Sequence, residues 1–266
     1  MDDDATPARA DRSCPQNVQY RTDANLAARQ SVYAYQHPRI DLPAAVLDLP
    51  GLRGGETVAD VGCGNGAYLA QLASRGHAGP VLGVDLSPGM LRAARRRAPR
   101  ARVVAADAAA LPIADGACDL ALAAHMLYHA SDPRAAVREL RRITRDGGHV
   151  LVVLNGEDHL RELRDAMAAA RPGTPAGERA AQGERLRLDH GADLLAAEFR
   201  SVTRYDFPGE LLIPGPGPVE DYVRSMITTQ ELPAPEDFVA AVSGLLGRGH
   251  PEMIRIRTHS GCLVAT

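Results

Sequence analysis

A glycine-rich segment at residues 58–66 carries the clearest chemical signal in the sequence. It reads Val-Ala-Asp-Val-Gly-Cys-Gly-Asn-Gly, a short strand-like run followed by alternating glycines. Because glycine has no Cβ, a ligand can approach the backbone closely at Gly62 and Gly64. A helix that begins directly after the glycines adds partial positive charge from its first amide groups. The segment is therefore typical of a turn that holds a nucleotide-like ligand.

A carboxylate follows at a spacing that suits the same ligand. Asp85 comes 23 residues after Gly62, at the end of the next predicted strand. A carboxylate in that position can accept two hydrogen bonds from a ribose diol. Gly62, Gly64 and Ala67 also satisfy the pattern G-x-G-x-x-A, so these residues alone leave a nicotinamide or flavin enzyme open.

The elements that must position these residues alternate between strand and helix, and helical patterns of roughly 10–15 residues separate several of the strands. We predict an α/β fold with a seven-stranded, mostly parallel sheet and helices on both faces. Ligands bind such sheets at the carboxyl ends of the strands, where the strand order changes direction. The predicted strands are 57–61, 81–84, 101–105, 120–124, 150–154, 201–207 and 254–264.

The chain divides into four predicted regions. Residues 1–18 are polar and are expected to form a disordered lead-in, and residues 19–50 form a helical cover. Residues 51–155 hold the cofactor-binding core. Residues 156–266 complete the sheet and add acceptor-pocket elements, including a Pro- and Gly-rich lid at 171–190.

Three further boundaries follow from local signals. Ser87, with Pro88 directly after it, is expected to cap the start of a helix. The helix that opens at Pro133 is expected to end at Gly147-Gly148, because paired glycines stop a helix. The Pro-rich stretch at 208–218 is expected to be a loop, followed by helices at 219–228 and 236–246.

The pattern Asp60-x-Gly62-x-Gly64-x-Gly66 resembles the first motif of class I S-adenosylmethionine-dependent methyltransferases. Four more motifs continue the resemblance in the same order and spacing, and together they cover roughly residues 55–155. The set favours this family, with its Rossmann-like fold, over a nicotinamide or flavin enzyme. These motifs are Gly83–Ser87, Ala106–Ala108, Cys118–His129 and Asp146–Gly148.

The resemblance implies S-adenosylmethionine as the cofactor. Gly62 and Gly64 would lie against its methionine moiety and ribose. Asp60 would help to position the methionine ammonium, and Asp85 would bind the ribose hydroxyls. The carbonyl of Ala124 would also meet the ammonium.

The remaining predicted contacts concern the adenine and the carboxylate of the cofactor. Leu86 and Met90 would pack on the adenine, while Asp107 would accept from its amino group and the Ala108 amide would donate to the ring. The segment 20–29 resembles the N-terminal cofactor cover of some small-molecule members, so Tyr20 or Arg29 would meet the carboxylate. Simpler roles stay open, because Asp60 or Asp107 could be loop or capping residues and Leu86 could be core.

Methyl transfer from a sulfonium is an in-line displacement, and a base is needed only when the acceptor is protonated. His125 and His129 follow the fourth strand, and either imidazole could take a proton near neutral pH. His129 could instead pin its loop through Ser131 or Asp132. Less favoured candidates for the base are His159, Tyr33 and His37. The segment 124–127 lacks the Asn/Asp-Pro-Pro-Tyr/Phe motif of enzymes that methylate nucleic-acid bases.

Composition limits the partners. The formal net charge is −3, the four cysteines form no C-x-x-C pair, and no signal-peptide pattern or long apolar run is present. We therefore expect no metal, no membrane, no nucleic acid and a cytoplasmic location. One basic cluster is expected to be a solvated helix face, with an acidic or RNA partner as the alternative. Its members are Arg92, Arg95, Arg96, Arg97, Arg100 and Arg102.

The sequence thus predicts a methyltransferase that acts on a small molecule at oxygen, nitrogen or carbon, in specialised-metabolite biosynthesis, as a monomer or homodimer. Two alternatives stay open. One is an RNA or protein methyltransferase, and the other is an S-adenosylmethionine-binding protein without activity.

Overall fold

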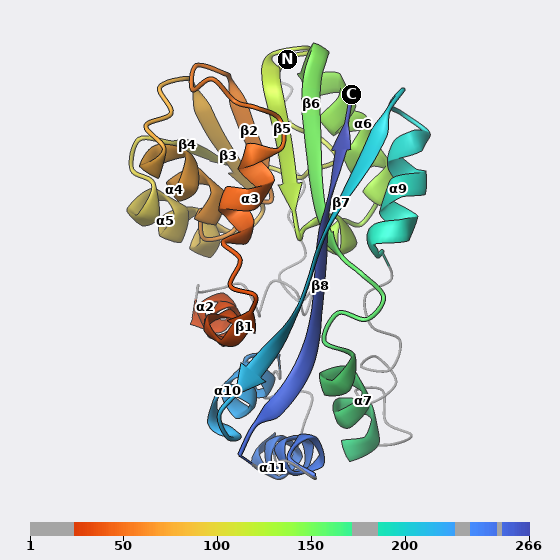
Figure 1. The fold of residues 1–266 in the computed structure, drawn as a ribbon. Coiled ribbons are helices and arrows are strands. Elements are labelled where there is room, and N and C mark those ends of the chain that lie inside the picture. Colours follow the sequence, from red (N-terminus) through yellow and green to blue (C-terminus); the bar gives the residue numbers. More distant parts are fainter. Residues whose placement is uncertain (1–23, 172–185, 227–234, 249–251) are drawn as a thin grey trace, which may run out of the picture.

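The computed structural model describes residues 24–171, 186–226, 235–248 and 252–266. One twisted sheet runs through the molecule in the order β1-β7-β8-β6-β5-β2-β3-β4 (Figure 1). Strands β2 to β6 are parallel to one another, whereas β8 is antiparallel to both β6 and β7. The strands are β1 (Gln36–His37), β2 (Val58–Val61), β3 (Val81–Asp85), β4 (Arg102–Ala105), β5 (Cys118–Ala124), β6 (Thr144–Asn155), β7 (Val202–Ile213) and β8 (Ile254–Ala265).

The predicted fold class is confirmed, and all seven predicted strands are present. The eighth strand, β1, is a two-residue bridge in which Gln36 pairs with Leu211 and His37 pairs with Glu210. A strand of this length leaves no periodic pattern in the sequence. The order changes direction at β2, which lies between β3 and β5, so a ligand is expected at the end of β2.

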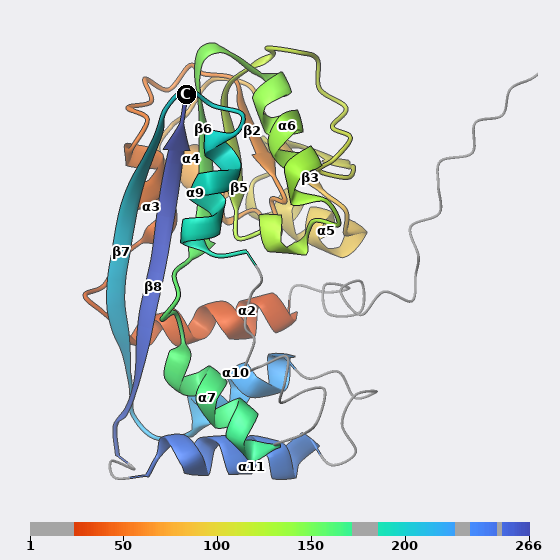
Figure 2. The same cartoon turned by 90° about the vertical axis from the view of Figure 1, so that its right-hand side faces the viewer.

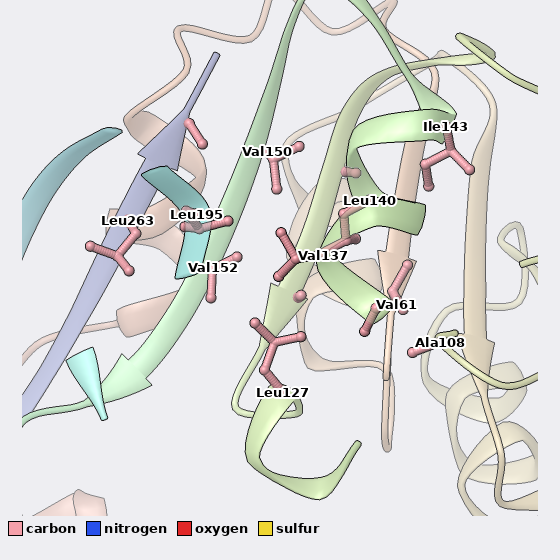
Figure 3. Close-up of a cluster of buried hydrophobic side chains, with 14 of the residues drawn as sticks. Val61, Ala108, Leu127, Val137, Leu140, Ile143, Val150, Val152, Leu195 and Leu263 are labelled. Atoms are coloured by element: carbon pink, nitrogen blue, oxygen red, sulfur yellow. The ribbon is translucent and has the colours of Figure 1, made fainter. Parts of the chain in front are cut away.

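Helices cover both faces of the sheet. Helices α3 (Leu42–Asp48), α4 (Ala67–Ser74) and α5 (Pro88–Arg97) pack on one face, and α6 (Pro133–Ile143) and α9 (Leu188–Ala196) pack on the other. Figure 3 shows the core under α6, in which Leu140 and Ile143 of the helix belong to the same buried cluster as Val150 and Val152 of β6. The Ser87 hydroxyl accepts from the Met90 amide at 3.3 Å and caps α5, as predicted.

A second apolar core lies beyond the carboxyl ends of the parallel strands. The lower halves of β7 and β8 extend into it and meet α7 (Arg161–Ala170), α10 (Gly217–Met226) and α11 (Pro235–Leu246). Helix α2 (Ala24–Ser31) crosses between this helical part and the sheet, and the short helix η1 (Val32–Tyr35) follows it (Figure 2). The N-terminal helical region therefore lies where a cofactor cover is expected.

The predicted end of the helix that opens at Pro133 is wrong. The helix ends at Ile143, and residues 144–155 form β6, in which Thr144 pairs with Cys118. A Cβ on Gly148 would lie 2.8 Å from the backbone oxygen of Asp119. Gly148 is therefore needed for close approach of two strands rather than for a helix stop.

The predicted loop at 208–218 is also wrong, because β7 continues through Pro208 to Ile213. Pro208 pairs with His259 of β8, and on its other side β1 reaches only Glu210 and Leu211. A proline that donates no amide is tolerated where a strand has no neighbour on one side. Helix α9 was not predicted, and it begins inside the region assigned to a lid.

Several predictions fall outside the described residues. These include the lead-in at 1–18 and residues 172–185 of the lid. Within the described part of the chain, no helix is both long and apolar enough to cross a membrane.

Candidate cofactor and acceptor site

Three glycines form the turn between β2 and α4. Gly62, Gly64 and Gly66 have φ of +72°, +52° and +78°, a region that other L-residues rarely adopt. A Cβ on Gly62 would lie 2.5 Å from the Met126 Cβ, and one on Gly66 would lie 2.9 Å from the Ala94 Cα. Gly62 and Gly66 are therefore required by the packing of the protein itself.

Gly64 differs, because the space beside it is open. The nearest atom to a Cβ there would be the Leu26 Cδ2 of α2, at 3.6 Å. The Gly64 amide donates to Asp85 Oδ2 at 2.9 Å, and the Ser87 amide donates to Asp85 Oδ1 at 2.8 Å. The parallel pairing of β2 with β3 thus brings Gly64 and Asp85 together at neighbouring strand ends. A ligand there would meet bare backbone beside a carboxylate.

Asp60 is a buried carboxyl next to this turn. It is 1% exposed, and among the described residues its Oδ2 has no hydrogen-bond partner. Burial, and then the charge of Asp85, raises the pKa of Asp60 to about 8. Burial also raises the pKa of Asp85, while the amides of Ser87 and Gly64 oppose that rise. An unpaired carboxyl in such surroundings favours a cationic ligand group, which would draw off its proton.

The residues predicted for the adenine lie around the ends of β3 and β4. Leu86 is 57% exposed, an unusual state for a large apolar side chain, whereas Met90 is 1% exposed and lies in the core. Leu86 is therefore the apolar side chain open to a ligand. The exposed Asp107 caps its own turn, because its Oδ1 accepts from the Ala109 amide at 2.9 Å. Ala108 is buried at the same turn.

Helix α2 covers the glycine turn. Leu26 faces Gly64, and the Gln30 Oε1 accepts from Asn65 Nδ2 at 2.9 Å. Arg29 lies on the same helix, where its Nε donates to the Asn25 carbonyl at 3.2 Å. Tyr20 lies outside the described residues. The structure thus brings Arg29 into the region of the site.

Strand β5 supplies the other wall. It runs to Ala124, two residues beyond Leu122, which is the last β5 residue that pairs with β2. His125 follows with φ +53°, a left-handed conformation that is rare for a side chain of its size. Its amide donates to the Val153 carbonyl at 2.9 Å, which fixes the residue at the strand end.

The two histidines proposed as bases differ in exposure. His125 is half-buried, and burial followed by the neighbouring His129 lowers its pKa to about 4. Crowding by protein atoms and the charge of Arg29 also lower the pKa of His129, although much of that residue remains open to solvent. Both rings are therefore neutral at pH 7, a form that can accept a proton but with a weak driving force.

Near His125 lies the hydrogen-bonded pair Tyr33 and His159, two of the less favoured candidates for the base. The Tyr33 hydroxyl is 3.0 Å from His159 Nε2, and the His259 amide donates to His159 Nδ1 at 3.0 Å. His159 is 6% exposed, and burial first, then the nearby His125, lowers its pKa to about 3. His37, also considered as a base, is exposed on β1. No local signal joins Tyr33 to His159, because 126 residues separate them.

The fold and the site together define a class of protein. The sheet order with antiparallel β8, and a glycine turn beside the acidic end of the next strand, are those of the Rossmann-like class I methyltransferases. Residues 59–152, about a third of this chain, match the model of the Methyltransferase domain family.

Two named relatives are each similar to less than half of this chain. The malonyl-[acyl-carrier protein] O-methyltransferase of Serratia marcescens is 34% identical over 126 residues, which are 47% of this chain and 49% of that protein. The demethylmenaquinone methyltransferase of Beutenbergia cavernae is 40% identical over 108 residues, 41% of this chain and 44% of that protein. The match thus spans less than half of each relative.

Solved structures share the fold over most of the chain. A Bacillus halodurans protein, assigned provisionally to the methyltransferases, gives a TM-score of 0.60 at 19% identity and covers 84% of this chain and 97% of its own. The [4+2]-cyclase SpnF gives a TM-score of 0.61 at 20% identity, with 94% and 95% covered. At this identity the similarity describes the fold and not the reaction.

Proposed function

We propose that the chain transfers the methyl group of S-adenosylmethionine to a small-molecule acceptor. The observation that carries this proposal is the contact between the Gly64 amide and the Asp85 carboxylate at the strand ends. Two features of the site fit the cofactor independently. Gly64 leaves space beside its backbone, and the buried Asp60 has an unpaired oxygen suited to an ammonium group.

We assign the cofactor contacts of the described residues as follows. Asp60 and the Ala124 carbonyl meet the methionine ammonium, and Arg29 meets the carboxylate. Asp85 accepts from the ribose hydroxyls through the lone pairs that the Gly64 and Ser87 amides leave unused. This arrangement holds the ribose against the glycine turn.

The adenine would lie over Leu86, whose exposed side chain supplies an apolar surface. Asp107 Oδ1 is occupied by the Ala109 amide, so Asp107 Oδ2 is the oxygen that would accept from the adenine amino group. The Ala108 amide would donate to the ring. Met90 would pack in the core rather than contact the base.

The protein contributes to transfer mainly by placement. Holding nucleophile, methyl carbon and sulfur in line can remove on the order of 7–11 kcal/mol from the barrier. S-adenosylmethionine supplies the electrophilic methyl group, and the described parts of the N-terminal and C-terminal regions, from residue 24 to 50 and after residue 155, would enclose the acceptor. His125 is the better placed base, because it follows Ala124 directly and is half-buried.

The test is a mass screen for methylated products. Wild-type protein and S-adenosylmethionine are added to a small-metabolite extract of the source cells, and products that gain one CH2 are sought. We expect such a product with the wild type and a strongly reduced yield with Asp85→Ala. Cofactor binding without any product would favour the alternative of a binding protein.

A second candidate is an RNA or protein methyltransferase, which the arginines on and after α5 would favour. Arg92, Arg95, Arg96, Arg97 and Arg100 are all exposed, and Arg97 Nη1 donates to Asn65 Oδ1 at 3.2 Å beside the glycine turn. RNA binding that weakens steeply with salt would support this candidate. Binding that is absent at low salt would reject it for RNA.

A further inference from the structure

A layer of buried polar side chains separates the two apolar cores along the hairpin β7–β8. On one face of β8, Ile254 and Ile256 belong to the lower core, whereas Cys262, farther along the same face, belongs to the upper core beside α3 and α4. Between them the same strand carries hydroxyl side chains, and polar residues from three other segments join it. This polar layer consists of Gln36, Asn155, His159, Thr258 and Ser260, each no more than 9% exposed.

One hydroxyl of the polar layer, that of Thr258, forms no hydrogen bond with the described residues. The residue is 3% exposed, and among the described residues its Oγ1 has no hydrogen-bond partner. A hydroxyl buried in this way costs free energy unless a partner is supplied. A Cβ on the opposite residue, Gly209, would lie 3.0 Å from Thr258 Oγ1 and 3.2 Å from Gln36 Nε2. Gly209 thus keeps the space between these two polar groups free of a side chain.

The Tyr33–His159 pair has a defined direction. His159 Nδ1 accepts from the His259 amide, so in the neutral ring the proton is on Nε2. Nε2 therefore donates to the Tyr33 oxygen at 3.0 Å. The hydroxyl proton of Tyr33 must then point away from His159. His159 is a fixed donor in this state and cannot accept a proton at Nε2.

The layer contains no ionised side chain. Its members are amides, hydroxyls and a neutral imidazole, and the adjoining His125 is neutral as well. Charged groups beside the layer serve other partners: Arg164 Nη1 donates to the His159 carbonyl, Asp206 pairs with the His259 ring, and Arg257 pairs with Glu162. An ionised ligand group in the layer would lose water without gaining a counter-charge.

We propose that the polar layer binds the methyl acceptor and selects an uncharged molecule with hydroxyl or carbonyl oxygens, with Thr258 as a specificity-determining contact. This inference rests on the proposed methyl transfer. It deepens that function by naming a substrate class and the residues that recognise it. His125 links the layer to the proposed cofactor site, since it directly follows the end of β5 and is close enough to His159 to affect its pKa.

The test replaces Thr258 with valine, which has nearly the same shape but no hydroxyl. Thr203→Val, at an exposed position of β7 on the same hairpin, is the matched control. The first measurement needs no acceptor. Because the variant removes an unpartnered hydroxyl, the melting temperature of Thr258→Val should equal or exceed that of the wild type. A clear decrease would show that the hydroxyl serves the fold and would overturn the proposal.

The second measurement uses methyl-labelled S-adenosylmethionine and the metabolite extract, separated by ion exchange into anionic, cationic and uncharged pools. We expect label in the uncharged pool, about tenfold less with Thr258→Val, unchanged labelling with Thr203→Val and unchanged affinity for S-adenosylhomocysteine in both variants. Label in a charged pool alone, or equal labelling by Thr258→Val, would overturn the acceptor site. No label in any pool would instead count against methyl transfer itself.

Discussion

Asp60 should release a proton when the cofactor binds. Its pKa of about 8 in the ligand-free protein means that roughly nine in ten molecules carry the carboxyl proton at pH 7. A methionine ammonium beside the unpaired Oδ2 favours the ionised form, so the proton leaves on binding. The ligand amine, with a pKa near 8, takes up about 0.1 proton at the same pH. The net release at pH 7 is therefore about 0.8 proton, and by pH 9 the net change reverses to uptake.

Calorimetry with S-adenosylhomocysteine measures this number. Titrations at pH 7 in phosphate and in Tris, which differ in ionisation enthalpy, give the count of protons exchanged. Asp60→Asn has the same shape but no ionisable proton, so it should bind more weakly and release none. Equal proton counts for the wild type and Asp60→Asn would refute the assignment of Asp60 to the ammonium.

The same pKa has a consequence for stability without ligand. The folded-state pKa of Asp60 lies above the ordinary carboxyl value of 3.8, so between about pH 4 and pH 8 the folded form holds a proton that the unfolded form has lost. The contribution of Asp60 to the free energy of unfolding therefore falls as pH rises through this window. Asp60→Asn should remove that fall, which denaturant unfolding at pH 5 and pH 8 can detect.

Three substitutions test other parts of the structure. Gly64→Ala should weaken binding of S-adenosylhomocysteine at least tenfold, while its loss of stability, about 1 kcal/mol, should match that of Gly76→Ala, which has a similar φ of +71° and open space. Equal affinity in the two variants would mean that no ligand approaches Gly64. Asp85→Ala should lower cofactor affinity by about 1–3 kcal/mol in calorimetry, and an unchanged value would remove Asp85 from the ribose site. Leu140→Ala should lower the free energy of unfolding by about 2–5 kcal/mol in denaturant titration, since the side chain is fully buried in the core of Figure 3. A loss below 1 kcal/mol would contradict that packing.

The sequence predicted that Gly64 and Asp85 lie together because the signals for both residues are local. Each signal can be recognised from a few neighbouring residues. The first is the glycine pair Gly62 and Gly64, and the second is the carboxylate at the end of the next strand. Parallel pairing of β2 with β3 then brings them together without any further information. The cap at Ser87 is equally local, and it was predicted in place.

The acceptor side could not be predicted, because it is assembled from distant segments. Thr258 looks like an ordinary strand residue until the hairpin places it between two cores. The contact of Tyr33 with His159 depends on how η1 packs against the segment before α7. The helix end was wrongly predicted at Gly147-Gly148, because glycine is favoured both where strands pack closely and where helices end.

A crystal structure with bound S-adenosylhomocysteine tests the central claim most directly. We expect both ribose hydroxyls within hydrogen-bond distance of the Asp85 carboxylate, the ligand backbone against Gly64 and the ammonium at Asp60. Density for the ligand elsewhere on the molecule, or a nicotinamide dinucleotide retained at the glycine turn, would contradict the assignment.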